Sequence, residues 1–293
     1  MRYLFDSSAI NWMHNEPDRE PLLLRLLAAN EVRVSALTVA EVARTPDPKR
    51  RISLLQLLKR LTGEIRPLEE PEVLIRRGMM SYALQESTVT VTEDETPVAW
   101  SVLQDPTQIS DEARRLLDQF QSTRETDFLE LHRRARPDFQ ELFANGSKRP
   151  RSAAELLRLY MGNREFLWQL LSPTYESMTG QAFSEKEIYG LLQSLPFLST
   201  YLLAWGYSVY KRAVAGEGYG ATNAGVTDIS YATYFFWVER FVTADRKQYR
   251  ALRIIAHVGA PGCSVLRYQT FRREQAIGVL GREGHQATAT PRP

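Results

Sequence analysis

The stretch from Gly225 to Asp245 constrains the fold most, because it places acidic residues at the ends of two consecutive predicted elements. Asp228 stands where a helix is predicted to begin, and about three turns of mostly apolar helix are expected after it. A short run rich in β-forming residues follows and ends at Asp245. Two carboxylates are therefore predicted at the ends of adjacent elements.

The first residues of the chain show the same arrangement of a short predicted strand that ends at an Asp. Residues 2–5 form a short apolar run that meets Asp6, and the residues after Asp6 are predicted to begin a helix. Helical spacing of leucines continues to residue 29, and 32–35 is predicted to be a second strand. Strand, helix and strand in this order predict a parallel sheet. Ligands of such sheets gather at the carboxyl ends of the strands, where Asp6 and Asp245 are expected.

A fourth acid, Glu41, follows the second predicted strand in the sequence Thr38-Val39-Ala40-Glu41. With Asp6, Asp228 and Asp245 it resembles the signature of the PIN-domain family of metal-dependent nucleases. The accompanying hydroxyls are Ser8 and Thr243, and the resemblance covers roughly residues 1–45 and 221–270. It implies an α/β fold with a PIN-like parallel sheet flanked by helices, and hydrolysis of phosphodiester bonds.

The four acids suggest a site for a hard divalent ion. Carboxylate oxygens select Mg²⁺ or Mn²⁺ over zinc, and such ions activate water for attack on a phosphate. Asp6, Asp228 and Asp245 are predicted metal ligands, and Glu41 a ligand or a base that orients water. Ser8 and Thr243 are expected to hold the carboxylates in position.

Each acid also has a simpler interpretation as part of a helix cap. An Asp between a strand and a helix is a favoured N-cap, which applies to Asp6, Asp228 and Asp245. Glu41 has the spacing of a capping box with Thr38. The order of all four acids favours the metal site, and the two interpretations remain open at this point.

The long middle of the chain lies outside the resemblance. Prolines at 46 and 48 end one helix, and four glycines between 216 and 225 mark a loop that leads the chain back to the nuclease-like part. The sequence therefore predicts a nuclease-like domain at 1–45 and 221–283, a mostly α-helical insertion at 46–220, and a disordered tail at 284–293. Residues 88–92 alternate like a strand, and apolar stripes at helical spacing are predicted at Leu156, Leu157 and Tyr160 and at Ile188, Leu191 and Leu192.

The net charge limits the kind of nucleic-acid surface that the chain can have, and the cysteine content indicates its cellular compartment. The formal net charge is only +2, so any nucleic-acid surface must be a local patch. The single Cys263 excludes an internal disulfide and fits a reducing, cytoplasmic compartment. No signal peptide is recognised, and the apolar segment 195–210 is too short for a membrane span, so it is expected to be a buried helix or a subunit contact.

The basic residues are less specific than the acids. Arg246 and Lys247, directly after Asp245, are the best placed to touch a substrate. A second group lies in the predicted insertion, where it fits either a solvated charged surface or a phosphate-binding one; it consists of Arg133, Arg134, Arg136, Lys148, Arg149 and Arg151.

The resemblance implies an endoribonuclease that cuts single-stranded or looped RNA. Small bacterial members of the family mostly cut RNA and are often toxins held by an inhibitory protein, but the insertion here is far longer than theirs. The alternatives are a catalytically weak RNA-binding or assembly module, and a structure-specific DNA nuclease. A homo-oligomer or an inhibitory protein partner is compatible with each of them.

Overall fold

A computed structural model describes residues 1–85, 97–107, 152–211 and 225–276, with isolated positions between 109 and 137. The strand predicted at 88–92, the glycine-rich return of the chain before residue 225 and the predicted tail at 284–293 lie outside these residues.

Four parallel strands form one sheet in the order β2-β1-β3-β4. They are β1 (Arg2–Phe5), β2 (Glu31–Arg33), β3 (Arg240–Thr243) and β4 (Ser264–Arg267). The parallel α/β sheet expected from the sequence is thereby confirmed. It joins the first residues of the chain to residues about 240 positions later, because β1 pairs with β3 in register Phe5 to Val242.

The second strand is shorter than predicted. It ends at Arg33 because Ser35 leaves the sheet to cap α3 (Ala36–Ala43), where its hydroxyl accepts from the backbone N–H of Thr38. Ser35 keeps one isolated parallel bridge, to Leu68.

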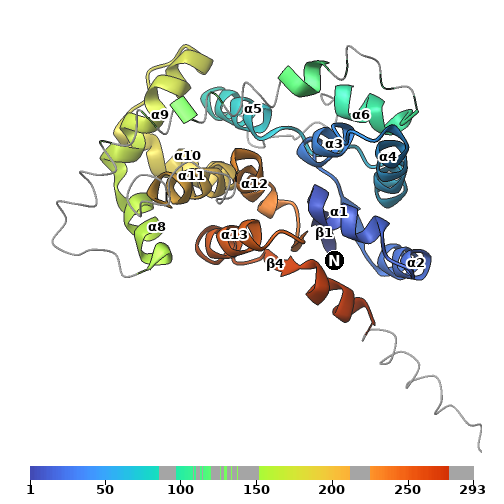
Figure 1. Cartoon of the computed structure of the whole chain (residues 1–293). Helices are drawn as coiled ribbons and strands as arrows, with labels where there is room; N and C mark the ends of the chain where they lie inside the picture. The colour runs from blue at the N-terminus through green and yellow to red at the C-terminus, as the bar shows by residue number, and fades with distance from the viewer. Residues whose placement is uncertain are drawn as a thin grey trace, which may run out of the picture.

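One face of the sheet carries Tyr3, Phe5 and Val242, which alternate with the residues of the other face. These side chains share a core with helices α1 (Ser7–His14), α2 (Arg19–Ala29), α3, α4 (Pro48–Thr62) and α6 (Pro97–Gln104), and with helical residues 268–276. Figure 1 shows α1 to α4 and α6 together on the right of the molecule.

The opposite face carries Leu4, Phe241 and Val265. Its core is completed by α13 (Arg246–Gly259) and by helices from the middle of the chain, which gather on the left of Figure 1 around α11 (Pro196–Val209). Those helices are α8 (Ala153–Gly162), α9 (Arg164–Thr179), the 3-10 turn η1 (Glu185–Glu187) and α10 (Ile188–Ser194), with α5 (Pro71–Ala83) beside them. The stripes predicted in α8 and α10 are buried, as Leu156, Leu157, Tyr160, Ile188, Leu191 and Leu192.

The described helices of the predicted insertion share both cores with the strands. The leucines of α4 pack in the first core, and α11 packs directly on α13 in the second. Segment 195–210 is accordingly a buried helix, the first of its two expected forms. None of the described helices has the length and apolar character needed to cross a bilayer. The boundaries proposed at 46 and 220 remain a prediction.

The helix expected after Asp228 differs from the prediction. Instead of about three turns of α-helix, the chain forms a short helix α12 (Val226–Ser230) and continues as the 3-10 helix η3 (Tyr231–Phe236). The residues of η3 are bulky and largely aromatic, and five of the six are buried, so tertiary packing determines their tighter winding.

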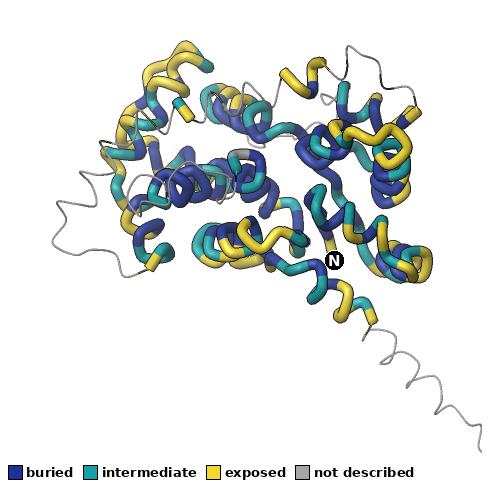
Figure 2. The backbone as a smooth tube through the Cα atoms, in the orientation of Figure 1, coloured by how far each residue is buried: buried dark blue, intermediate teal, exposed yellow. Residues whose placement is uncertain are grey.

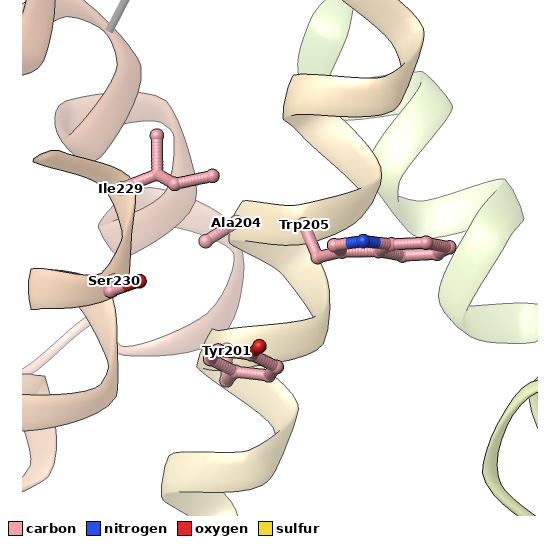
Figure 3. A pocket seen from close by; sticks show the side chains of 5 residues that line it. All are labelled: Tyr201, Ala204, Trp205, Ile229 and Ser230. Carbon is pink, nitrogen blue, oxygen red and sulfur yellow. The ribbon is translucent and has the colours of Figure 1, made fainter. Parts of the chain in front are cut away.

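Helix α12 is held in place by α11. Ala204 of α11 points toward Ile229 of α12, whereas the ring of Trp205 points away from α12 (Figure 3); with Tyr201 and Ser230, these residues line one small space. The space between these side chains is too small to admit a water molecule. A helix from the middle of the chain therefore supports the short element that carries Asp228.

Candidate acidic site

Asp6 lies at the carboxyl end of β1 and is 3% exposed. Its Oδ1 accepts from the backbone N–H of Ala9 at 2.7 Å, so Asp6 is the N-cap of α1, as the simpler interpretation predicts. Its Oδ2 accepts from the hydroxyls of Ser8 at 2.7 Å and Thr243 at 2.8 Å. Capping thus uses one carboxylate oxygen, while the two predicted hydroxyls hold the other.

Asp245 is joined to Asp6 through the same hydroxyls. Its backbone N–H donates to Thr243 Oγ1 at 2.9 Å and to Ser8 Oγ at 3.2 Å. Its Oδ1 accepts from the backbone N–H groups of Lys247 and Gln248, which makes Asp245 the N-cap of α13. Asp245 is exposed at this edge of the sheet, whereas Asp6 is buried.

Glu41 does not form the capping box expected from its spacing. The N-cap of α3 is Ser35, so Thr38 and Glu41 lie inside the helix. Glu41 Oε2 instead accepts from the hydroxyl of Tyr231 at 3.0 Å, although the two residues are separated by 190 positions. The simpler interpretation of Glu41 is therefore wrong, and the carboxylate is directed toward η3.

Asp228 occupies the third position of α12. Its Oδ2 accepts from the backbone N–H of Gly225 at 2.7 Å. The backbone carbonyl of Asp228 accepts from the side-chain amide of Gln248 at 3.2 Å, which ties α12 to α13. Asp228 is thus held by two hydrogen bonds, one to the start of its own helix and one to the first turn of α13.

The acids at this edge of the sheet influence each other electrostatically. Burial raises the pKa of Asp6 to about 7, and the charge of Asp228 adds to this rise. The hydrogen bonds from Ser8, Ala9 and Thr243 act in the opposite direction.

The pKa of Glu41 also rises to about 7. Burial is the main cause, followed by the charge of Asp228 and then, more weakly, that of Asp6. Hydrogen bonds from Ser7 and Tyr231 lower the pKa of Glu41 and offset part of this effect. The structure therefore brings Asp6, Glu41 and Asp228 within mutual electrostatic influence.

The acids approach each other without forming a complete metal cage. Among the residues that the structure describes, no group of three or more His, Cys, Asp or Glu side chains is close enough to hold an ion. The donor set nevertheless fits a hard divalent ion, since it consists of oxygen atoms alone.

Two polar groups at this edge were missed by the sequence analysis. Tyr231 contacts Glu41, and Thr38 Oγ1 lies 3.1 Å from the Tyr231 hydroxyl and donates to the carbonyl of Phe5. Arg267 pairs in register with Thr243 at the end of β4, and its Nε is buried without a hydrogen-bond partner among the described residues. An Arg that ends an apolar strand was the available signal for Arg267, but nothing local pointed to Tyr231.

The predicted basic contacts differ in position. Arg246 and Lys247 are exposed in the first turn of α13, next to Asp245. Arg133 is paired with Glu130 at 2.9 Å. Arg134 and Arg149 lie outside the described residues.

A depression of about 400 Å³ lies away from the acids, between α1 and helical residues 268–276. Trp12 and Tyr268 line it, and its Arg272 is paired with Glu16 and Asp18. Trp12 lies near the end of α1 that is remote from Asp6, so this depression is separate from the acidic site.

Comparison of the chain with protein-family models, curated proteins and solved structures gave no match.

Proposed function

We propose that the chain is a divalent-metal-dependent endonuclease, with Asp6, Glu41 and Asp228 as the central metal ligands and Asp245 as an outer one. The observation that supports this most is the convergence of Asp6, Glu41 and Asp228, because burial and mutual repulsion raise the pKa values of Asp6 and Glu41. Neighbouring carboxylates, of which Asp6 is buried and Glu41 and Asp228 are half-buried, repel one another unless cations neutralise them.

The side chains have distinct parts in this proposal. Ser8 and Thr243 orient one oxygen of Asp6, and the Tyr231 hydroxyl orients Glu41. A bound Mg²⁺ or Mn²⁺ would polarise an oxygen of the substrate phosphate and lower the pKa of a bound water molecule. Arg267 and Arg246 are the nearby cationic candidates for contact with substrate phosphates, since they lie at the end of β4 and in the first turn of α13.

RNA is the proposed substrate because the resemblance to PIN domains favours it. Labelled single-stranded RNA, transfer RNA, single-stranded DNA and flapped duplex are incubated with Mg²⁺, with Mn²⁺ or with chelator. We expect metal-dependent cleavage of single-stranded or looped RNA that is lost in Asp6→Asn and Asp228→Asn. Metal-independent cleavage, or full activity of both variants, contradicts the proposal.

A further inference from the structure

The outward face of α13 is uniformly basic. Its exposed positions include Arg246, Lys247, Arg250 and Arg253, and no acidic residue occurs anywhere in the helix. The inward face buries Gln248, Ala251, Leu252, Ile255 and Ala256. Figure 2 shows exposed turns on this helix beside buried ones. The helix is thus strongly two-sided, with one sign of charge on its outer side.

This face departs from the charge balance of the chain. The formal net charge of the whole protein is +2, from 37 basic and 35 acidic residues. Arg246, Lys247, Arg250 and Arg253 contribute +4, so the remainder of the chain has a formal charge of −2. A solvated helix face commonly mixes both signs, whereas this face concentrates positive charge locally.

The arginines of this face form no ion pair within the part of the chain that the structure describes. The guanidinium carbon of Arg253 lies 5.5 Å from the ring centroid of Tyr249, on the preceding turn of the same helix. Successive arginines are separated by about 4.5–6 Å along the helix axis. Their long side chains can therefore meet successive phosphates of one strand.

The position of the face connects it to the acidic site. The basic helix begins directly at Asp245, which is hydrogen-bonded to the hydroxyls that hold Asp6. A strand that lies along α13 is thereby led to the carboxyl edge of the sheet.

We infer that the outer face of α13 binds the phosphodiester backbone of a single nucleic-acid strand and directs it to the acidic edge. The identity of the partner rests on the proposed function, while the location rests on the charges of α13. Contacts to the backbone carry no sequence information, so RNA and DNA strands of the same sequence should depend on this face alike.

Binding is measured by fluorescence anisotropy with labelled single-stranded RNA and DNA, in chelator, over a range of salt concentrations. We expect Arg250→Gln with Arg253→Gln to weaken binding by about tenfold and to reduce the salt slope by about 0.7 for each lost contact. Arg250→Lys with Arg253→Lys keeps the charge and should retain most of the affinity. The control removes two exposed charges elsewhere, Arg76→Gln with Lys186→Gln, and should bind like the wild type.

Wild-type affinity and salt slope in the Gln variant overturn the inference, as does the absence of binding to either strand. Equal competition by polyglutamate also overturns it, because the face would then be a general anion surface. Failure of the catalytic proposal is distinguishable: binding that depends on α13 without metal-dependent cleavage supports the inference and rejects the nuclease.

Discussion

Asp6 and Glu41 are carboxyl groups whose raised pKa values should make the stability of the protein depend on pH. Their folded pKa values of about 7 exceed the unfolded values of about 4, so the folded state retains protons that the unfolded state loses between these values. Their contribution to stability is thus fully present below about pH 4 and is lost as the pH rises through about 7.

We therefore expect the metal-free protein to lose stability between pH 5 and pH 8, by about a few kcal/mol from these two groups. Glu41→Gln removes one of the two groups and should flatten this dependence. Mg²⁺ or Mn²⁺ should restore stability at pH 8, where the ligands are ionised. Denaturant unfolding at both pH values provides the measurement, and an identical pH dependence in the Gln variant contradicts the raised pKa.

Asp228 allows the two interpretations of the acids to be separated. Asn can still accept from the backbone N–H of Gly225, while its neutrality removes the repulsion that acts on Glu41 and Asp6. Asp228→Asn should therefore be neutral or stabilising in chelator and respond much less to metal than the wild type, while cleavage falls by orders of magnitude.

Thermal unfolding of both proteins, with chelator and with metal, decides between the interpretations. If the acids only cap helices, the variant should lose up to about 1 kcal/mol and the metal responses should be equal.

Among the elements, the contact between α11 and α13 controls how firmly α12 is supported. A side-chain carbon added at Gly259, the last residue of α13, would collide with Leu203 and would lie 3.2 Å from a methyl group of Thr200, both in α11. We expect Gly259→Ala to cost about 1–3 kcal/mol, since buried side chains must shift.

Gly162→Ala provides a matched control, because Gly162 ends α8 and a carbon added there meets nothing within 4 Å. Chemical unfolding of the two variants tests the expectation. Equal stability of both would show that α11 and α13 adjust without cost.

At the scale of the whole molecule, the described helices of 46–220 share cores with the sheet. The predicted insertion and the predicted nuclease-like domain should therefore not unfold independently. Val242 packs in one core with α4, and Phe241 in the other with α11. Calorimetry should show one cooperative transition with equal calorimetric and van't Hoff enthalpies. Two resolved transitions would instead support a separately folding insertion.

Local spacing in the sequence was sufficient to predict the βαβ start, the parallel sheet and the buried stripes of α8 and α10. Spacing also placed Asp6 at the carboxyl edge of the sheet, where residues that follow parallel strands meet, whereas its two hydroxyls were predicted from the resemblance to PIN domains. These features depend on side-chain periodicity and on the order of elements, which neighbouring residues specify.

Only the tertiary structure determined the rest. Ser35 rather than Thr38 caps α3, and aromatic packing shortens the helix after Asp228, so the local sequence pattern predicted neither helix boundary. The bond from Tyr231 to Glu41 joins residues 190 positions apart. Such a contact depends on how η3 packs against α3 in space, which no local spacing encodes.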